Sequence, residues 1–443
     1  MLEIDGMRVE IGKPISTDGG VVFVARRIRR SAWFKALVPE LRKVVAAVNG
    51  QRYGFAAKAK LSRTLVALIA GLAMGYRSGK EIADVIGADR LWREVLGARV
   101  TQIDLSRLVG ILADRGLDPL RRGVLASASE GGRTLHLDGD SSLLALHGKQ
   151  EGGAWNGHYQ EFGYHAGWLF DRSGRLAALW LMEGNAHTAQ GQSDQLTWML
   201  EEGRSIASYR GDAGMPSARL LKLLDKEHVD FVLRLRANSK LDELAQDLCP
   251  DLPRMGGAIA FSEFTYRAKT WDRERRVAVK FQVPMGEDGA PALFTENFYF
   301  VTSSDAAPDA VVERYLRRGE AERLFGEFKA ALEPTFRHAE LGKNQIWAQF
   351  LALAHNVLVD LRDRIDGGRE LKPRPSLKPL REGSGWSVLA TAFHWAPVRP
   401  TLNRFRAFAL KLANGVCQHA RTTVLRLHPQ HLKPAWPMAL APT

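Results

Sequence analysis

The pattern of apolar residues changes near Gly132, and this change restricts the folds that are open to the chain. Before it, apolar residues recur at spacings of three and four, as amphipathic helices require, in stretches such as 65–76 and 101–116. After it, short β-rich runs come first and then alternate with helical runs. A run of strands followed by such an alternation is typical of a mixed α/β sheet. We therefore expect an all-α region followed by an α/β domain.

The expected helical region is basic. The chain carries a formal net charge of +13, and the excess of Lys and Arg falls in roughly the first 125 and the last 110 residues. Basic ends around an acidic centre suit a protein that binds a polyanion such as nucleic acid, with solubility alone as the alternative. Ser78 and Thr101 are expected to cap helices. Residues 80–96 are the best candidate for a helix-turn-helix that reads DNA.

Two classes of protein are not supported by the sequence. Cys249 and Cys417 lie far apart and outside any Cys/His ligand spacing, so neither a disulfide scaffold nor a zinc site is indicated. The first residues lack the pattern of a secretion signal, and the apolar run 65–76 is too short to span a bilayer. We expect a cytoplasmic protein without a membrane anchor.

A strand-rich stretch interrupts the α/β pattern, and its last strand, "FYFVTSS" at 298–304, is expected to return to the sheet. A Lys/Pro/Gly-rich span at 366–385 is typical of a linker. The predicted division is a basic helical DNA-binding or dimerisation domain at 1–128, the first part of the core at 129–240, a β-strand insertion at 241–296, the second part of the core at 297–366, and a linker with a basic tail at 367–443.

Two acidic segments stand at predicted strand ends. Asp138 and Asp140 are two residues apart in "LHLDGD" and therefore face the same side of a strand. Carboxylates stacked in this way repel one another unless a cation neutralises them, so one of the two is a candidate metal ligand. Asp212 follows the β-rich run "IASYRG" in a strand-to-helix loop, where α/β folds build active sites. Taken alone, Asp212 is as well explained as a capping or turn residue.

A third acid lies in the helical segment 315–329, "YLRRGEAERLFGEFK". At about 100° per residue, four of its side chains fall within a sector of roughly 60°: Tyr315, Arg318, Glu322 and Lys329. A solvated charged face is the ordinary reading of such a pattern. Together with the two aspartate segments, however, Glu322 completes a set of three oxygen ligands, which favours Mg²⁺ or Mn²⁺ over zinc. The residues alone therefore indicate a metal-dependent enzyme that acts on nucleic acid.

The same residues resemble a known family. The helical segment matches the Y-x2-R-x3-E-x6-K signature of bacterial DDE insertion-sequence transposases at every fixed position. The stretch "DSSLLALHGKQ" is similar to the first-aspartate region of the piggyBac-like branch, and this register favours Asp140 over Asp138. "YRGDAG" resembles the second-aspartate segment of the family. The resemblance covers roughly residues 133–364.

The resemblance implies an RNase H-like catalytic core of the α/β class with a β-rich insertion, preceded by an all-α DNA-binding domain. It implies that two Mg²⁺ or Mn²⁺ ions are held by Asp140, Asp212 and Glu322. It also implies that Tyr315, Arg318 and Lys329 contact phosphates near the cut. The implied function is cut-and-paste transposition, in which a homodimer binds the terminal inverted repeats, cuts DNA, in some members through hairpin ends, and joins the 3′-hydroxyls to target DNA.

Further DNA contacts are expected beside this core. Trp271 in the insertion is a candidate for stacking on a base, with packing in the protein core as the alternative. The other candidates for DNA contact are Lys149, Gln150, Arg273, Arg275 and Arg276. Two other functions stay open: a metal-dependent nuclease without strand transfer, and a repurposed DNA-binding protein that does not cut.

Overall fold

The structure is a computed structural model. It describes residues 2–4, 7–11, 16, 18–48, 55, 57–130, 132–250, 258–285, 290–292, 294–365, 401–406, 410, 414–419 and 422–427. Of the linker and basic tail predicted at 367–443, residues 367–400 lie outside the described residues.

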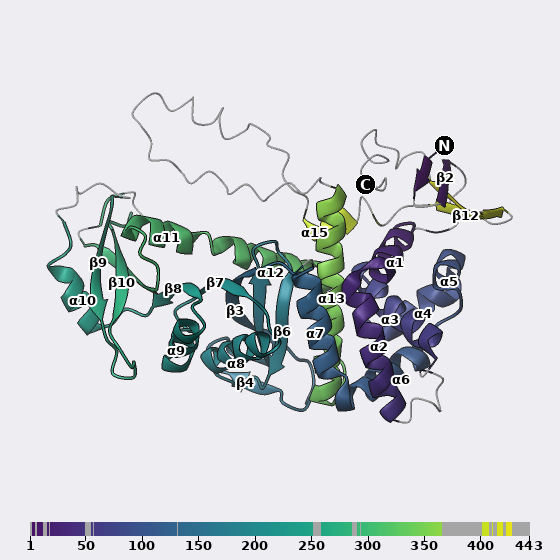
Figure 1. The fold of residues 1–443 in the computed structure, drawn as a ribbon, viewed down its shortest axis with the longest axis horizontal. Helices are drawn as coiled ribbons and strands as arrows, with labels where there is room; N and C mark the ends of the chain where they lie inside the picture. The colour runs from purple at the N-terminus through teal and green to yellow at the C-terminus, as the bar shows by residue number, and fades with distance from the viewer. Residues whose placement is uncertain are drawn as a thin grey trace.

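Helices make up most of the N-terminal region (Figure 1). They are α1 (Val21–Arg30), α2 (Ala32–Ala47), α3 (Lys58–Ala73), α4 (Gly79–Ala88), α5 (Arg90–Leu96), α6 (Gln102–Arg115) and α7 (Leu117–Ala128). Both predicted caps are confirmed, because Ser78 accepts from the backbone of Glu81 and Thr101 forms a reciprocal capping box with Asp104. The candidate reading segment 80–96 consists of α4 and α5, which meet at Asp89.

A nine-stranded mixed sheet follows, which confirms the predicted α/β class. Its strands are β3 (Leu135–Ala145), β4 (Ala154–Asn156), β5 (Glu161–Asp171), β6 (Leu176–Met182), β7 (Ile206–Gly211), β8 (Asp230–Leu235), β9 (Ile259–Tyr266), β10 (Arg275–Gln282) and β11 (Glu296–Thr302). They follow the order β4-β5-β3-β7-β8-β11-β10-β9, and β6 also pairs with β5. β6, β5 and β3 are antiparallel neighbours, whereas β3, β7 and β8 are parallel.

The strands of the predicted insertion extend this sheet. β9 pairs with β10, β10 pairs with β11, and β11 pairs with β8, all antiparallel. The segment 298–304 therefore contributes β11 and returns to the sheet as expected, with Val301 opposite Leu233. Among the described strands, pairing therefore runs without a break from β8 through β11 and β10 to β9.

Helices cover both faces of the sheet. They are α8 (Thr188–Glu201), α9 (Ala218–Lys226), α10 (Ser239–Gln246), α11 (Pro308–Leu316), α12 (Gly319–Leu332) and α13 (Leu341–Ile365). The alternation of side chains along β8 shows the two faces: Phe231 and Leu233 pack in a cluster with α8, α9 and α10, while Val232 packs with α11.

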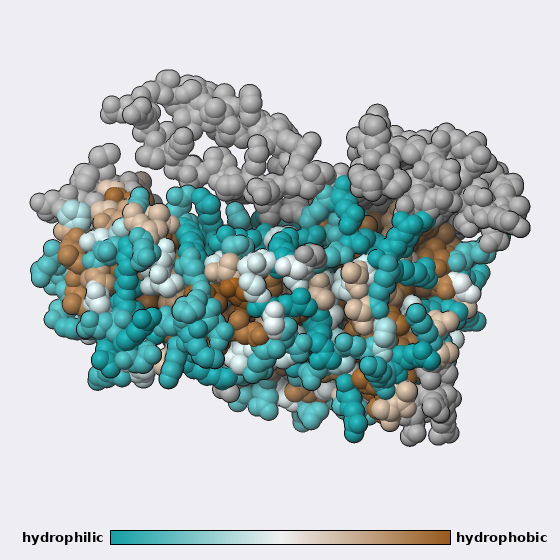
Figure 2. Space-filling model, viewed as in Figure 1, coloured by the Kyte–Doolittle hydropathy of each residue, from teal (hydrophilic) through white to brown (hydrophobic). Residues whose placement is uncertain are grey.

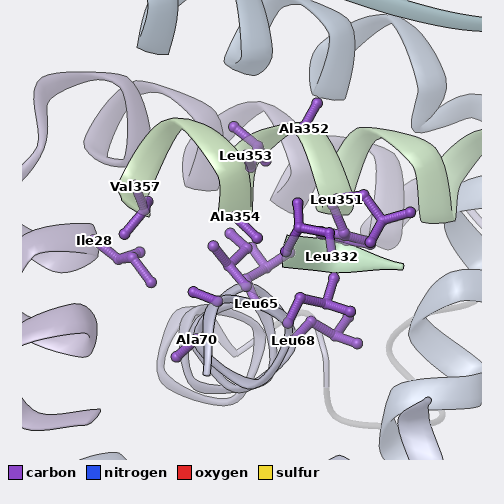
Figure 3. Close-up of a cluster of buried hydrophobic side chains, with 14 of the residues drawn as sticks. Ile28, Leu65, Leu68, Ala70, Leu332, Leu351, Ala352, Leu353, Ala354 and Val357 are labelled. Atoms are coloured by element: carbon purple, nitrogen blue, oxygen red, sulfur yellow. The ribbon is translucent and has the colours of Figure 1, made fainter. Parts of the chain in front are cut away.

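Helix α13 joins the N-terminal helices to the sheet. It packs against α3, α6 and α7 on one side and against β6 on the other. Figure 3 shows Leu65 and Leu68 of α3 beside Leu351 and Ala354 of α13, all of which are almost fully buried. One apolar cluster runs from α1 through α13 to β5 and β6. The helical region and this end of the sheet therefore share a core.

The sequence predicted a purely helical N-terminal region, but the structure also places strands there. Strands β1 (Leu2–Ile4) and β2 (Met7–Ile11) form a small sheet with β12 (Asn414–His419) and β13 (Thr422–Leu427), in which β2 and β13 run parallel. A short helix, α15 (Leu402–Phe405), contacts α12 and α13. The two ends of the sequence thus meet, which period-two patterning in such short segments could not reveal.

The face of the molecule seen in Figure 2 is mostly hydrophilic, with apolar patches between polar ridges. Within the described residues, no helix combines the length and the apolar character that crossing a membrane requires.

Candidate active site

The first predicted ligand lies beside the point where a neighbouring strand stops. We expected Asp140 at a strand end. This prediction was wrong, because strand β3 continues to Ala145. However, β7 pairs with β3 only as far as Gly139 opposite Gly211, and Asp212 follows directly. The free edge of β3 beyond this pairing leaves room beside Asp140 for other elements of the site.

Asp138 has a structural role in a buried ion pair. Its two oxygens accept from Arg210 Nε at 2.5 Å and from Arg210 Nη2 at 2.7 Å, and both residues are almost fully buried. Arg210 Nη1 also donates to the carbonyl of Arg314 at 2.6 Å. With both oxygens bound, Asp138 is not available as a metal ligand, which favours the register in which Asp140 serves.

Gly139, between the two aspartates, is required by packing. A Cβ atom at this position would lie 2.2 Å from the Tyr209 hydroxyl and 2.7 Å from Oε1 of Gln192. The amide of Gln192 in turn donates to the Asp140 carbonyl at 2.9 Å. The motif Asp-Gly-Asp therefore lets α8 and β7 approach β3 closely and fixes the backbone of Asp140.

Asp212 begins the loop between β7 and α9. Its Oδ1 accepts from the backbone N–H of Gly214 at 2.9 Å, so one oxygen stabilises the loop. The side chain is half-buried. The turn reading that competed with the catalytic one is thus correct for one oxygen of this carboxylate.

The helical segment that carries Glu322 is two helices rather than one. α11 ends at Leu316 and α12 begins at Gly319. The junction has tight hydrogen bonds over three residues, from Arg318 N–H to the Tyr315 carbonyl at 2.7 Å and from Ala321 N–H to the Arg318 carbonyl at 2.8 Å. A uniform 100° per residue therefore does not apply across it, and the single-helix prediction was wrong.

Arg318 links two of the three acids. Its Nη2 lies 2.8 Å from Oδ2 of Asp140, and its Nη1 lies 3.1 Å from Oε1 of Glu322. Arg318 is only 5% exposed. The reading of this segment as a solvated charged face is therefore wrong for Arg318, although Glu322 itself is largely exposed.

The electrostatics of Asp140 reflect its neighbours. Burial raises the pKa of this carboxyl above its ordinary value, and the nearby charges of Asp212 and Glu322 raise it further. The Arg318 guanidinium and the Ser141 backbone N–H lower the pKa of Asp140, without cancelling the effect of burial. The three acids thus share one electrostatic environment around one buried cation.

Two other residues of the signature lie beside this group. Lys329 Nζ donates to the Ser142 hydroxyl at 2.8 Å and lies 4.4 Å from the centre of the Phe325 ring. Tyr315 is 8% exposed and packs against Phe300, with ring centres 4.8 Å apart. The ring of Tyr315 therefore belongs to a small apolar cluster under α11.

The acids do not converge tightly. Among the residues that the structure describes, no three His, Cys, Asp or Glu side chains lie close enough together to hold a metal ion as placed. The donors present are carboxylate oxygens, which suit a hard divalent cation, but the guanidinium of Arg318 bridges two of them.

Sequence reasoning missed Tyr159, which lies at the tip of the hairpin between β4 and β5. Its hydroxyl donates to the Ser141 carbonyl at 3.3 Å, and burial together with the charges of Asp140 and Asp212 raises the pKa of this hydroxyl. Asn156 fixes the tip, because its Oδ1 accepts from the Tyr159 N–H. No local signal marks this residue, since only the β4–β5 pairing brings it to β3.

The candidates in the insertion have structural partners. Trp271 is 6% exposed and packs against Tyr266, so it fits the core alternative and offers no open ring face to a base. Arg275 is buried in ion pairs with Asp225 at 2.5 Å and with Asp272 at 3.0 Å. Both side chains are therefore almost fully buried in this arrangement of the chain.

The remaining candidates for DNA contact differ in their exposure and in their partners. Arg273 is exposed and pairs with Asp225, and Arg276 pairs with Glu263. Lys149 is exposed, whereas the amide of Gln150 donates to the Phe336 carbonyl at 3.1 Å. Of these residues, Lys149 and Arg273 are the most accessible cations.

The comparison with protein families decides the class of the chain. A family model described as transposase DDE domain group 1 matches residues 7–373. The chain belongs to this family. The predicted family is thereby confirmed, and the match begins before α1, so it includes the N-terminal helices, which resembled transposases only in their basic character.

Two further comparisons add little to this assignment. A cryo-EM structure of a piggyBac transposase synaptic complex with hairpin DNA matches this DDE transposase with a TM-score of 0.45 and 10% identity, covering 71% of this chain and 68% of that one. No curated protein matches the sequence.

Proposed function

We propose that this transposase cuts DNA at the ends of a mobile element with Asp140, Asp212 and Glu322, and joins the freed 3′-hydroxyls to target DNA. The observation that carries the proposal is the pair of contacts by which Arg318 joins Asp140 of β3 to Glu322 of α12, with Asp212, at the end of β7, near enough for its charge to act on both Asp140 and Arg318. The pairing of β3 with β7 closes the separation of 72 residues between the two aspartates, and the two ion pairs of Arg318 connect Asp140 to Glu322 on α12.

The strand order supports an RNase H-like core. Three antiparallel strands, β6, β5 and β3, are followed across the sheet by the parallel strands β7 and β8. This agrees with the order expected from the resemblance, with β9 and β10 in the insertion between Asp212 and Glu322, and β11 as the strand that returns to the sheet.

We assign the metal ligands to Asp140, Asp212 and Glu322, whose oxygens suit Mg²⁺ or Mn²⁺. When bound, two such ions activate a water or a 3′-hydroxyl and stabilise the leaving oxygen at a phosphodiester. The chain itself orients the site: Gln192 holds the Asp140 backbone, and the Asx turn at Gly214 holds Asp212.

Phosphate contacts are assigned to cations beside the acids. Lys329 lies next to β3 through Ser142, and Arg318 offers a planar fork that matches phosphate oxygens. Tyr315 would act through packing, because its ring is buried. The net charge of +13 supports binding to duplex ends by the basic N-terminal helices. The homodimeric complex is proposed from the resemblance to the piggyBac-like branch.

Cleavage of a labelled duplex with the element's end and flank tests the proposal. With Mg²⁺, the wild type is expected to nick at the end, whereas Asp140→Asn, Asp212→Asn and Glu322→Gln bind the duplex but lose cutting by at least about a hundredfold. Asp309→Asn, which removes an acid from the first turn of α11, is the matched control and should cut normally. Normal cutting by the three variants would refute the assignment, and nicking without strand-transfer products would indicate a nuclease.

A further inference from the structure

Arg318 holds the same oxygens that the proposed function assigns to metal. One guanidinium nitrogen binds Oδ2 of Asp140 and the other binds Oε1 of Glu322. A divalent cation that uses these two oxygens must displace a positive group that is already there. Arg318 is therefore a competitor for the metal site in this arrangement of the chain.

The same residue can also bind phosphate. Arg318 is 5% exposed, and its Nε is buried without a hydrogen-bond partner. Its third contact, from Nη2 to the Gly139 carbonyl, is long at 3.5 Å. An unsatisfied buried donor next to two occupied ones leaves the guanidinium with hydrogen-bonding capacity that a phosphate oxygen would satisfy.

Neither partner of this ion pair can be left without an opposite charge. A buried guanidinium that loses both carboxylates is destabilised unless another negative charge replaces them, and Asp140 likewise needs another cation if it loses the guanidinium. DNA together with a divalent cation replaces both at once, because a phosphate takes the guanidinium and the cation takes the carboxylates. Either one alone leaves one partner uncompensated.

We propose that Arg318 couples metal binding to DNA binding in this transposase. Without DNA, the guanidinium occupies Asp140 and Glu322 and keeps the affinity for divalent metal low. With DNA, a backbone phosphate binds Arg318 and releases the carboxylates to the metal. The inference rests on the proposed function, since it takes Asp140 and Glu322 as metal ligands, and it assigns to Arg318 a positioning role beyond phosphate contact.

The coupling must be reciprocal. If DNA increases the affinity for metal by some factor, metal increases the affinity for DNA by the same factor, and such couplings commonly amount to about 5- to 150-fold. Removing the charge of Arg318 should therefore raise the affinity for metal in the absence of DNA and weaken the dependence of each ligand on the other.

Mn²⁺ binding measured by electron paramagnetic resonance tests the inference without any cleavage. The full chain is titrated with Mn²⁺ alone and with a duplex that carries the element's end. For the wild type we expect weak binding that tightens at least about tenfold with DNA. For Arg318→Gln we expect binding without DNA to be at least about tenfold tighter than in the wild type. DNA phosphates can ligate Mn²⁺ themselves, so the measurement without DNA is decisive.

Two variants serve as controls. Arg317→Ala removes the neighbouring, exposed arginine, which pairs with Glu313 at 2.9 Å, and should leave Mn²⁺ binding unchanged. Arg318→Lys keeps the charge and should still bind Mn²⁺ weakly without DNA. It serves as the second test if thermal denaturation shows that Arg318→Gln is not folded. Equal Mn²⁺ affinities for the wild type and Arg318→Gln would overturn the coupling. So would an Arg318→Lys variant that binds Mn²⁺ without DNA as tightly as the wild type binds it with DNA.

Asp140→Asn separates the inference from the proposed function. If this variant still binds Mn²⁺ with DNA as the wild type does, the ligand assignment fails, and the inference fails with it. If Asp140→Asn loses Mn²⁺ binding while Arg318→Gln binds as the wild type does in both conditions, the ligand assignment stands and only the coupling is wrong.

Discussion

At the scale of single residues, two aspartates two positions apart have opposite roles. Their spacing correctly indicated that Asp138 and Asp140 share a side of β3, but the spacing did not show which one has a permanent partner. That partner, Arg210, is 72 residues away and lies opposite Asp138 through the pairing of β3 with β7. The spacing alone therefore could not choose between the two acids; the resemblance favoured Asp140, and the contact that occupies Asp138 is one that local sequence does not encode.

The buried pair of Asp138 and Arg210 should matter more for stability than for chemistry. Arg210→Met leaves Asp138 buried without a counter-charge, and we expect a loss of about 3–5 kcal/mol in the free energy of unfolding. Urea denaturation followed by circular dichroism measures it. The double variant Asp138→Leu/Arg210→Met is expected to recover most of this loss, because no unpaired charge remains. A single variant as stable as the wild type would contradict the structural role.

At the scale of secondary-structure elements, the break between α11 and α12 shows where periodicity fails. The segment 315–329 has helical spacing throughout, yet Arg318 lies at the junction and points into the site, where two carboxylates stabilise it. The β-rich pattern of the predicted insertion forms strands β9 and β10, and their continuity with the main sheet depends on the pairing of β11 with β8. Long-range pairings of this kind override local propensity.

Glycines inside helices provide a test of local propensity. Gly326 lies in α12, and a Cβ atom there would meet nothing within 4 Å. Gly326→Ala should stabilise the protein by about 0.5–1 kcal/mol, since alanine is the better helix former. Gly71→Ala in α3 is the contrast, because its Cβ would lie 2.5 Å from Ile82 and should destabilise the protein. Urea denaturation of both variants checks the opposite signs.

The contact between α1 and α13 should respond to acid. Arg27 pairs with Asp360, and despite burial this pair and Arg364 lower the pKa of the Asp360 carboxyl below its ordinary value. A carboxyl whose pKa is lower in the folded than in the unfolded state stabilises the fold at any pH above its unfolded-state pKa, about 3.9. This stabilisation is lost as the pH falls through the folded-state pKa. Asp360→Asn should therefore be less stable at pH 7 by about 2 kcal/mol, with the difference shrinking below pH ~4. A difference that is constant between pH 7 and pH 3 in thermal unfolding would contradict this.

At the scale of the whole molecule, the division into domains was the least predictable feature. The spacing of apolar residues separated a mostly helical region from an α/β region, but α13, which follows the insertion in sequence, packs against both. Its apolar residues occur all around the helix, as expected for a helix buried between two layers. The sequence thus indicates that α13 is buried, while its two partners are visible only in the structure.

The shared core predicts unfolding as one unit. Leu351 of α13 is 1% exposed, and Leu351→Ala is expected to cost about 2–5 kcal/mol. Hydrogen exchange should then show reduced protection in both α3 and β6, which pack on α13. Leu316→Ala, at a 57% exposed position, is the control and should change neither. Reduced protection in α3 alone would contradict the shared core.

The position of α13 also limits which parts of this transposase can be exchanged for those of a relative. A swap of residues 1–128 for the equivalent region of a relative would place foreign side chains against Leu351, Ala354 and their neighbours in α13. Mismatched volumes at that contact would destabilise the catalytic sheet along with the grafted helices. A stably folded chimera would therefore need to carry both surfaces of this contact from the same parent.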